Sequence, residues 1–416
     1  MNNGGLYLIH AFLVLLNFAT LFLLYKLFEG TVSSIVFSLL TILCLYAFRT
    51  YDPDNLESYN EQLIRIFLST GVSFVPVLIF YPLLDDHVPR HAFAANLALN
   101  VLILPVLNVS FHKLTRKGKP TRYLVVGRRE EIENFLQKIE KETNHRYIFA
   151  EYVNPSVDLL SQKAKYYDAV LVADQRLSDV VKKASLKNIE YLPTFVEKVL
   201  QRIPVEIVQR YREFYELSLQ TVKTRSPAKR VIDVVVSIVA LVLTSPIMLI
   251  IALCILIEDG RPIIFKQRRI GKDGKPFTVY KFRTMRNSQT SQAKYATHEQ
   301  DRILKIGHII RPYRLDELPQ FINVLKGDMS VVGPRPEWID LANEYSQKIP
   351  YYDFRHIVKP GITGWAQIKY KYSASVEETK QKLSYDLYYV KNRTIFLDLK
   401  IMLHTLEAII FRRGAK

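Results

Sequence analysis

The chain has 416 residues, more than one hydrophobic core usually organises, so two or three domains are expected. Lysine and arginine number 57 against 40 aspartates and glutamates, and the net charge of +17 suits nucleic acid, anionic lipid or a phosphorylated substrate. The two cysteines, Cys44 and Cys254, lie in separate apolar runs and are too few for a disulfide framework or a cysteine metal cluster.

Four apolar runs fill the first quarter of the chain, at residues 6–28, 32–48, 63–84 and 92–111. Three of them reach about 20 residues, enough to cross a hydrocarbon core of about 30 Å, and the second would need its flanking residues. The first run is too long for a signal peptide and follows no basic segment, which indicates a retained anchor. We therefore predict four transmembrane helices over residues 1–115, with a buried soluble bundle as the alternative.

Basic residues cluster directly after the fourth run. They are Lys113, Arg116, Lys117, Lys119 and Arg122. Because positively charged loops stay on the cytoplasmic side, this cluster predicts that the rest of the chain is cytoplasmic. Arg49, between the second and third runs, agrees with that orientation, whereas Lys26 is a minor exception.

Residues 120–200 have the pattern of a small, Rossmann-like α/β domain with a parallel sheet. The segments RYLVVGRREEIENFLQKIEKE, RYIFAEYV and YDAVLVA alternate strand and helix patterns. Gly127 in the first turn is followed by Arg128 and Arg129 rather than by further glycines, so the dinucleotide-binding fingerprint is incomplete. We expect a structural or regulatory module in preference to a cofactor site. The polar stretch 201–226 is predicted to be a helical linker.

The apolar run at residues 231–257 is long enough to cross a bilayer but need not do so. Basic residues lie at both of its ends: Lys229, Arg230, Arg261, Lys266, Arg268 and Arg269. The positive-inside tendency would hold both ends on one side. Near the middle, Pro246 removes a backbone donor, and Ser245 can satisfy a freed carbonyl. We predict a re-entrant helix–break–helix over 229–257, with a plain fifth span, kinked at the proline, as the alternative.

Two adjacent carboxylates, Asp316 and Glu317, stand in the segment RPYRLDELPQ. Pro319 suits a first helical turn and Gly327 suits the position after a helix end, so a helix is predicted over 316–326. Acids at the start of a helix are ordinary, because the helix macrodipole stabilises them. That account explains one acid but not the arginines gathered around the pair.

A reaction centre is the alternative explanation of the pair. Adjacent residues on a helix point about 100° apart, so one carboxylate could attack a substrate while the other binds Mg²⁺. The cation, the helix terminus, Arg311 and Arg314 would keep the attacking aspartate ionised at neutral pH.

Basic residues mixed with glycine and proline form three blocks, at 265–285, 331–338 and 358–368. Guanidinium forks and ammonium groups beside backbone turns are suited to phosphate. Nucleic acid is the competing ligand, but the sequence contains no recognised nucleic-acid-binding motif, and we expect no such partner.

Five segments in the second half of the chain follow one another in a recognisable order. They are SPAKRVIDVVVSIVALVLTSPIM, KQRRIGKDGKPFTVYKFRTM, RLDELPQFINVLKGDMSVVGPRP, RHIVKPGITGWAQI and YDLYYVKN. With them, the chain from Ser226 onward resembles the bacterial sugar transferases, the monotopic polyprenyl-phosphate hexose-1-phosphate transferases. The resemblance implies a mostly helical monotopic catalytic domain over 227–416. The four spans and α/β module ahead of it resemble the long form that primes capsule, exopolysaccharide or O-antigen lipopolysaccharide synthesis.

The resemblance also implies a two-step, ping-pong reaction. Asp316 would attack the sugar-bearing phosphorus of a UDP-hexose and expel UMP, leaving a phosphosugar-aspartyl intermediate. Undecaprenyl phosphate would then take the phosphosugar, giving a polyprenyl diphosphate sugar. Glu317 would hold Mg²⁺, and glucose and galactose are the expected hexoses.

Further residues of the site follow from the same resemblance. Those expected to stabilise phosphate charge are Lys281, Arg283, Arg311, Arg335 and Lys359. Pro334 and Pro336 would shape a nucleotide contact, and Asp386 would have a supporting role.

Two other functions stay open. The chain could be a glycosyltransferase that releases UDP, or a non-catalytic scaffold of a polysaccharide assembly complex. The resemblance implies a multi-pass protein of the bacterial inner (cytoplasmic) membrane with its catalytic domain on the cytoplasmic face. The expected partners are the membrane, downstream glycosyltransferases and, as one option, a second copy in a homodimer.

Overall fold

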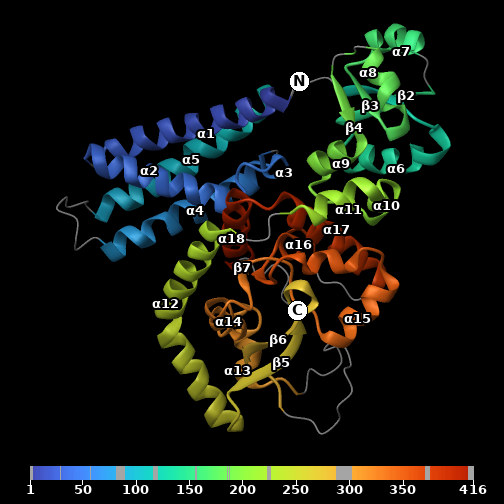
Figure 1. The fold of residues 1–416 in the computed structure, drawn as a ribbon. Coiled ribbons are helices and arrows are strands. Elements are labelled where there is room, and N and C mark those ends of the chain that lie inside the picture. Colours follow the sequence, from blue (N-terminus) through green and yellow to red (C-terminus); the bar gives the residue numbers. More distant parts are fainter. Residues whose placement is uncertain are drawn as a thin grey trace. The chain divides into compact units, whose positions relative to one another are not determined.

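A computed structural model describes most of the chain (Figure 1). The described residues are 3–28, 30–56, 58–80, 90–115, 120–154, 157–184, 186, 188–222, 226–286, 302–370 and 375–410. They form two compact units, residues 1–195 and 196–416.

Four long helices of the first unit coincide with the four apolar runs. They are α1 (Asn3–Lys26), α2 (Thr31–Ala47), α4 (Tyr59–Phe80) and α5 (Arg90–Thr115), and the short α3 (Pro53–Leu56) precedes α4. The helices pack on one another around a shared apolar core, so the prediction of four helices is confirmed.

Two of these helices, together with α12 (Pro227–Asp259) of the second unit, are long and apolar enough to be candidate membrane spans. Among the described residues, the stretches long and apolar enough to cross a membrane are Ile9–Lys26, His91–Thr115 and Pro227–Asp259. Helix α2 is shorter, and α4 begins with polar residues that include Glu61 and Arg65. The spanning roles of α2 and α4 therefore stay predictions, and so does the orientation, because Arg116, Lys117 and Lys119 lie outside the described residues.

Polar side chains connect the helices inside this bundle. The Asn17 side-chain amide donates to Asn108 Oδ1 at 2.8 Å, and the Asn108 amide donates to Gln62 Oε1 at 2.9 Å. The hydroxyls of Tyr25 and Thr41 lie 2.7 Å apart. Paired polar groups between helices are typical of membrane bundles, where an unpaired one would have no water to bind.

Residues 121–191 form the predicted parallel sheet. Its strands are β1 (Thr121–Val126), β2 (Tyr147–Val153), β3 (Ala169–Val172) and β4 (Ile189–Tyr191), in the order β2-β1-β3-β4, and all pairs are parallel. The helices of this part are α6 (Arg129–Glu142), α7 (Val157–Lys163), α8 (Ser178–Lys183) and α9 (Leu192–Leu200). Gly127 ends β1 with φ +153°, and a Cβ there would lie 3.3 Å from that of Ala173, so a close backbone approach requires glycine.

The described part of the predicted linker, 201–222 and 226, belongs to the second unit and contains two short helices. Helices α10 (Val205–Arg210) and α11 (Arg212–Gln220) accompany α17 (Val376–Asn392). The Ile203 amide donates to the Ser384 carbonyl at 2.8 Å.

The second unit is mainly helical, with two small sheets. The antiparallel hairpin is β5 (Ile264–Ile270) and β6 (Pro276–Phe282), and the parallel pair is β7 (Ser330–Val332) and β8 (Gly361–Thr363). The other elements are α13 (Lys305–Ile310), α14 (Gln320–Lys326), α15 (Ile339–Lys348), α16 (Trp365–Lys369) and α18 (Ile395–Ile410).

Helix α12 (Pro227–Asp259) contains the whole of the predicted re-entrant segment. The prediction of a break at Ser245–Pro246 was wrong, because the helix is continuous there and only bends (Figure 1). Pro246 leaves the carbonyl of Val242 without its usual donor, and the Ser245 hydroxyl donates to that carbonyl at 2.8 Å. The sequence-based role of Ser245 is thus confirmed.

The first turns of α12 are fixed to the second unit. Arg230 donates to the carbonyls of Val324 and Leu325, at the C-terminal end of α14, at 2.6 and 2.8 Å. The buried carboxylate of Asp233 accepts from the Ser330 hydroxyl and the Val331 amide, both at 2.9 Å. This end of the helix is therefore locked to α14 and β7.

The other end of α12 is fixed to the same unit. The Glu258 carboxylate accepts from the amides of Lys305 and Ile306 at 2.6 and 3.1 Å, at the start of α13. Ile251 and Ile255 are buried in a core with Phe282. Both ends of α12 are thus held by one packed unit.

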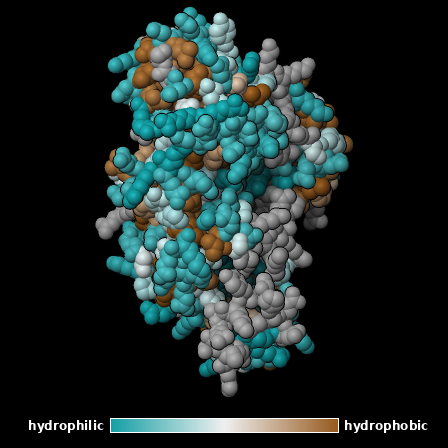
Figure 2. Space-filling model, turned by 90° about the vertical axis from the view of Figure 1, so that its right-hand side faces the viewer, coloured by the Kyte–Doolittle hydropathy of each residue, from teal (hydrophilic) through white to brown (hydrophobic). Residues whose placement is uncertain are grey.

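The middle of α12 is apolar and exposed. Its exposed residues include Val235, Ile238, Val239, Val242, Leu243, Ile247, Leu249, Ile250 and Leu253. Figure 2 shows the right-hand side of the view in Figure 1, where teal, hydrophilic residues outnumber brown ones among the residues drawn in colour. Among the described residues of the second unit, most of the exposed large apolar side chains therefore belong to α12.

Candidate active site

The paired carboxylates lie in a turn of their own. Leu315–Glu317 form a short 3₁₀ helix, and α14 begins only at Gln320, so the predicted helix start at 316 was wrong. The turn follows Arg314, whose backbone is left-handed with φ +54°, and this local change of direction separates it from α14. The predicted end is confirmed, since Gly327 closes α14 with φ +92°.

A buried asparagine brings this turn to the hairpin. Asn323 of α14 accepts from the Tyr280 amide at 3.1 Å and donates to the Thr278 carbonyl at 2.7 Å. These bonds fix α14 along the edge of β6, which carries Lys281 toward Glu317. A local feature of FINVLKG therefore sets the distance between two site residues that are 36 positions apart.

Glu317 is held by two cations. Lys281 Nζ lies 3.1 Å from Glu317 Oε1, and the Arg335 guanidinium lies 2.6 Å from Oε1 and 3.3 Å from Oε2. Burial alone would raise the pKa of Glu317, but Arg335 and Lys281 outweigh burial and hold this pKa well below its usual value. Glu317 is therefore an ionised carboxylate.

Asp316 differs from its neighbour in both contacts and charge. Within the described part of the chain, its carboxylate accepts no hydrogen bond, and it is only half-buried. Burial and the Glu317 charge raise the pKa of Asp316 to about 6, against the opposite effects of Lys281, Arg335 and Arg311. Asp316 is thus ionised at neutral pH, as expected, but its pKa lies closer to neutral pH than the sequence indicated.

The turn that carries Arg335 is held by hydrogen bonds from other elements. Pro334 and Pro336 have no N–H groups, and the four carbonyls of 334–337 each accept a hydrogen bond from outside the turn. The donors, in order, are the Gly361 amide at 2.9 Å, the Arg355 guanidinium at 2.8 Å, the Arg269 guanidinium at 2.6 Å and the Ile270 amide at 3.0 Å. These contacts fix the backbone from which Arg335 reaches Glu317.

Three residues predicted for the site, the phosphate-binding candidates Arg283 and Lys359 and the supporting residue Asp386, lie away from the two carboxylates. Arg283 is buried and donates to the carbonyls of Asp259 and Gly260, at the end of α12. Lys359 lies at the C-terminal end of α14, where its Nζ would be 3.5 Å from a Cβ on Gly327. Asp386 pairs with Arg355. The structure does not bring these three side chains to the two carboxylates.

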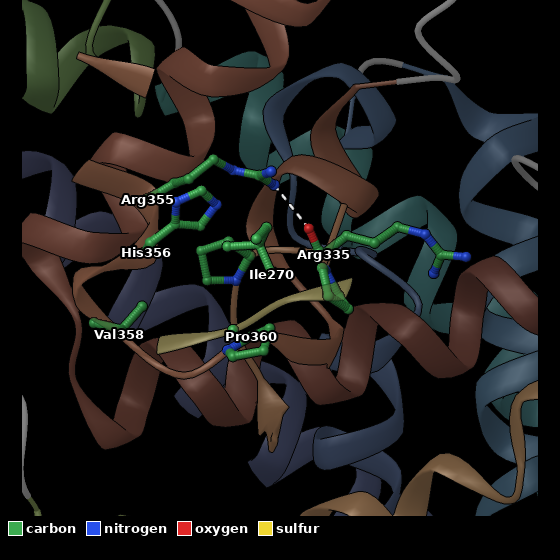
Figure 3. A pocket seen from close by; sticks show the side chains of 9 residues that line it. Ile270, Arg335, Arg355, His356, Val358 and Pro360 are labelled. Atoms are coloured by element: carbon green, nitrogen blue, oxygen red, sulfur yellow. Dashed lines mark hydrogen bonds between the residues drawn. The ribbon is translucent and has the colours of Figure 1, made fainter. Parts of the chain in front are cut away.

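A small cavity lies behind the turn of Arg335 (Figure 3). Its volume is about 10 Å³, and it is lined by Ile270, Gly271, Pro334, Arg335, Pro336, Arg355, His356, Val358 and Pro360. This space holds no more than one water molecule, so a nucleotide contact by Pro334 or Pro336 would have to use another face of the turn.

Comparison with known proteins assigns this part of the chain. Residues 224–412 match the family described as Bacterial sugar transferase. The Exopolysaccharide production protein PSS of Rhizobium leguminosarum bv. phaseoli is 38% identical over 191 residues, which are 44% of this chain and 96% of that protein. The chain belongs to the bacterial sugar transferase family.

Other relatives of this sugar transferase have names that state a reaction. The UDP-N-acetylgalactosamine-undecaprenyl-phosphate N-acetylgalactosaminephosphotransferase of Aeromonas hydrophila is 43% identical over 189 residues, 45% of each chain. The UDP-glucose:undecaprenyl-phosphate glucose-1-phosphate transferase of Escherichia coli (strain K12) is 42% identical over 180 residues, 42% of this chain and 39% of that protein. The matched region thus spans less than half of these two relatives.

The carboxylates of this sugar transferase fit a magnesium ion that shares its ligands with a substrate. Mg²⁺ is commonly held by one or two carboxylates together with substrate phosphates and water. Asp316 and Glu317 supply two carboxylates, and among the described residues no cluster of three or more His, Cys, Asp or Glu side chains could hold a metal alone. Glu317 Oε2, which has only the longer contact to Arg335, is the atom best placed to take such an ion.

Some residues of the site were not identified from the sequence. Arg269 and Arg355 support the turn of Arg335, although both lie in segments that the sequence analysis singled out. The basic composition of those segments was visible, but only tertiary contacts separate the arginines that face carboxylates from those that bind backbone.

Proposed function

We propose that this sugar transferase moves a sugar 1-phosphate, specifically a hexose 1-phosphate, from a UDP-sugar to undecaprenyl phosphate. The products are UMP and an undecaprenyl diphosphate sugar, the first intermediate of an exopolysaccharide, capsule or O-antigen. One observation carries the proposal: the half-buried Asp316, whose carboxylate accepts no hydrogen bond from the described residues, lies beside a Glu317 that two cations already neutralise.

In the first half-reaction, Asp316 is the nucleophile. An oxygen of its carboxylate forms a bond to the sugar-bearing phosphorus, and the bond from that phosphorus to the bridging oxygen breaks. The electron pair leaves with the bridging oxygen as UMP, and the phosphosugar stays on Asp316 as an acyl phosphate. Lys281 and Arg335 are near enough to Glu317 to offset the charge that develops on the phosphate oxygens.

In the second half-reaction, the acceptor restores the enzyme. A phosphate oxygen of undecaprenyl phosphate attacks the phosphosugar phosphorus, and the bond to the Asp316 oxygen breaks, which returns the carboxylate. Mg²⁺, when bound at Glu317, would neutralise diphosphate charge. Arg311 supports phosphate binding at this step, because its Nη1 is buried without a hydrogen-bond partner within the described residues.

Helix α12 is proposed to be re-entrant. A plain span would separate the partners of Asp233 from those of Glu258 by a bilayer, although Ser330 and Lys305 belong to one packed unit. The helix is about 50 Å long, and its bend at Pro246 lets the apolar middle enter one leaflet while both ends stay at the surface. This arrangement would hold Asp316 where the acceptor's phosphate meets the cytosol.

The first unit is proposed to anchor the enzyme in the bacterial inner membrane. The helices α1, α2, α4 and α5 would cross it, and the catalytic unit would be on the cytoplasmic face with the α/β module. Long apolar α1 and α5 support this placement. The proposed partners of the anchored enzyme are a second copy of the chain and downstream glycosyltransferases.

A nucleotide-release assay tests the function. The purified full chain, with undecaprenyl phosphate and Mg²⁺, is given UDP-glucose, UDP-galactose, UDP-N-acetylglucosamine and UDP-N-acetylgalactosamine separately. We expect UMP and a lipid-linked sugar phosphate with at least one of them. Release of UDP would identify a glycosyltransferase, and no release from any of them in a folded protein would favour a scaffold.

A further inference from the structure

A buried arginine at residue 355 connects α17 to the turn of Arg335. Its side chain is 3% exposed, as is that of Asp386, with which it forms an ion pair. Nε and Nη2 of Arg355 lie 3.1 and 2.8 Å from Asp386 Oδ2. The pair joins residues 31 positions apart, so it ties α17 to the segment before β8.

Every nitrogen of the Arg355 guanidinium is used inside the protein. Besides Asp386, Nη1 donates to the Tyr352 hydroxyl at 2.8 Å, and Nη2 donates to the Arg335 carbonyl at 2.8 Å. These four bonds use four of the five guanidinium N–H groups, and the side chain is only 3% exposed, so it is poorly placed to bind a phosphate. Arg355 therefore acts on the reaction only through the residues that it holds.

The hydrogen bond from Arg355 to the Arg335 carbonyl restrains the backbone of Arg335. Arg335 stands between two prolines, whose fixed φ angles leave its backbone few other conformations. Figure 3 shows Arg355 approaching the carbonyl from one side while the Arg335 side chain leaves on the other. Holding this carbonyl thus fixes the backbone from which the Arg335 side chain extends toward Glu317.

A second, half-buried contact from α17 reaches the same turn. Lys382 lies one helical turn before Asp386, on the same face of α17, and its Nζ is 3.9 Å from a Glu337 carboxylate oxygen. Behind the turn lies the small cavity, so side-chain packing is incomplete there. Directed polar contacts therefore contribute to holding the turn in place.

We propose that Arg355, held by Asp386, is a positioning residue that aims Arg335 at the reacting phosphates. The inference rests on the proposed transfer reaction. In the UMP-release reaction, Arg335 contributes only when its guanidinium stands beside Glu317, and a displacement of about 1 Å in such a group can lower a rate about 100-fold. Lysine cannot replace Arg355, because one ammonium cannot bind Asp386 and the carbonyl with a planar fork.

The test is a double-mutant cycle on the full chain with undecaprenyl phosphate, Mg²⁺ and the UDP-sugars that release UMP. Arg355→Met, Arg355→Lys and Asp386→Asn are each expected to lower kcat about 100-fold per folded molecule, with KM changed less than about threefold. In an Arg335→Met background, Arg355→Met should cause no further loss, since its target is already gone.

The matched control is Lys391→Met. Lys391 is on the same helix and forms a buried ion pair with Glu197 at 2.5 Å, away from the turn. The Lys391→Met variant should have a lower apparent Tm than the unmodified protein, while its kcat stays within about threefold of the unmodified value. A thermal unfolding curve for each variant gives the folded fraction by which kcat is normalised. Should Arg355→Met not fold, the milder Asp386→Asn enters the same cycle.

The outcomes separate the two proposals. If the unmodified protein releases no UMP, the proposed function fails before any variant is compared. If it does, the inference fails when Arg355→Met keeps its kcat, when Arg355→Lys restores it, or when the losses from Arg355→Met and Arg335→Met multiply.

Discussion

Arg335 and Glu317 meet through two contacts, Nη2 to Oε1 at 2.6 Å and Nη1 to Oε2 at 3.3 Å. Because this pairing and Lys281 neutralise Glu317, the adjacent Asp316 can also ionise near neutral pH despite the repulsion between two neighbouring carboxylates. The two acids are chemically distinct for that reason, and the predictions below depend on the difference.

Asp316→Asn should abolish UMP release, because an amide is not a nucleophile toward phosphorus. The same change removes a half-buried charge whose pKa is raised in the folded protein. A carboxyl with a raised pKa stabilises the folded state when it is protonated. This contribution to the free energy of unfolding is lost as the pH rises from the pKa of the unfolded chain to the folded pKa of about 6. Asp316→Asn should therefore be more stable than the unmodified protein above pH 6, by about 1–3 kcal/mol. Thermal unfolding at pH 7.5 checks this, and a lower Tm would contradict it.

The pH dependence of the first half-reaction should report Asp316. Only the ionised carboxylate attacks, so the rate of UMP release should fall about tenfold per pH unit below about 6 and level off above it. The measurement is a pre-steady-state burst of UMP between pH 5 and 8. A burst that keeps its rate at pH 5 would mean that another group is the nucleophile.

Replacing Lys281 and replacing Lys359, two lysines of the basic segments, should have very different effects on kcat. Lys281→Met should lower kcat about 100-fold, since Lys281 contacts Glu317 at 3.1 Å. Lys359→Met should keep kcat within about threefold, since Lys359 lies at the C-terminal end of α14. The two variants lose the same charge and serve as controls for each other. Equal losses would place Lys359 in the phosphate site after all.

Glu317 should determine the response to magnesium. EDTA is expected to stop UMP release and added Mg²⁺ to restore it. Glu317→Gln should raise the Mg²⁺ concentration for half-maximal rate at least about tenfold, because a ligand charge is lost. Titration of Mg²⁺ at saturating UDP-sugar provides the measurement, and an unchanged midpoint would remove Glu317 as the ligand.

The two ends of α12 should be accessible from the same side of the membrane. In a chain with Cys44 and Cys254 replaced by serine, single cysteines are placed at Val231 and Arg261, both exposed. A membrane-impermeant maleimide should label both in inverted vesicles and neither in intact spheroplasts. Labelling of the two positions from opposite faces would mean that α12 crosses the bilayer.

Short-range patterns in the sequence predicted most of the elements. The four apolar runs, the parallel α/β module and the end of α14 at Gly327 follow from apolar periodicity, strand and helix alternation, and the backbone freedom of glycine, all of which act over a few residues. The role of Ser245 beside Pro246 was predictable for the same reason, since the donor and the freed carbonyl are three residues apart.

Roles that depend on which distant group lies nearby could not be assigned this way. Arg283 and Arg335 are both arginines of basic segments, yet one caps α12 and the other holds Glu317. The sequence shows which residues are charged. Which group each charged side chain contacts depends on packing between elements that are far apart in the chain. The sequence by itself thus determined the family motifs, the apolar runs and the acid pair. Only the tertiary structure decided which cations face that pair, because electrostatic contact depends on distances that no spacing along the chain records.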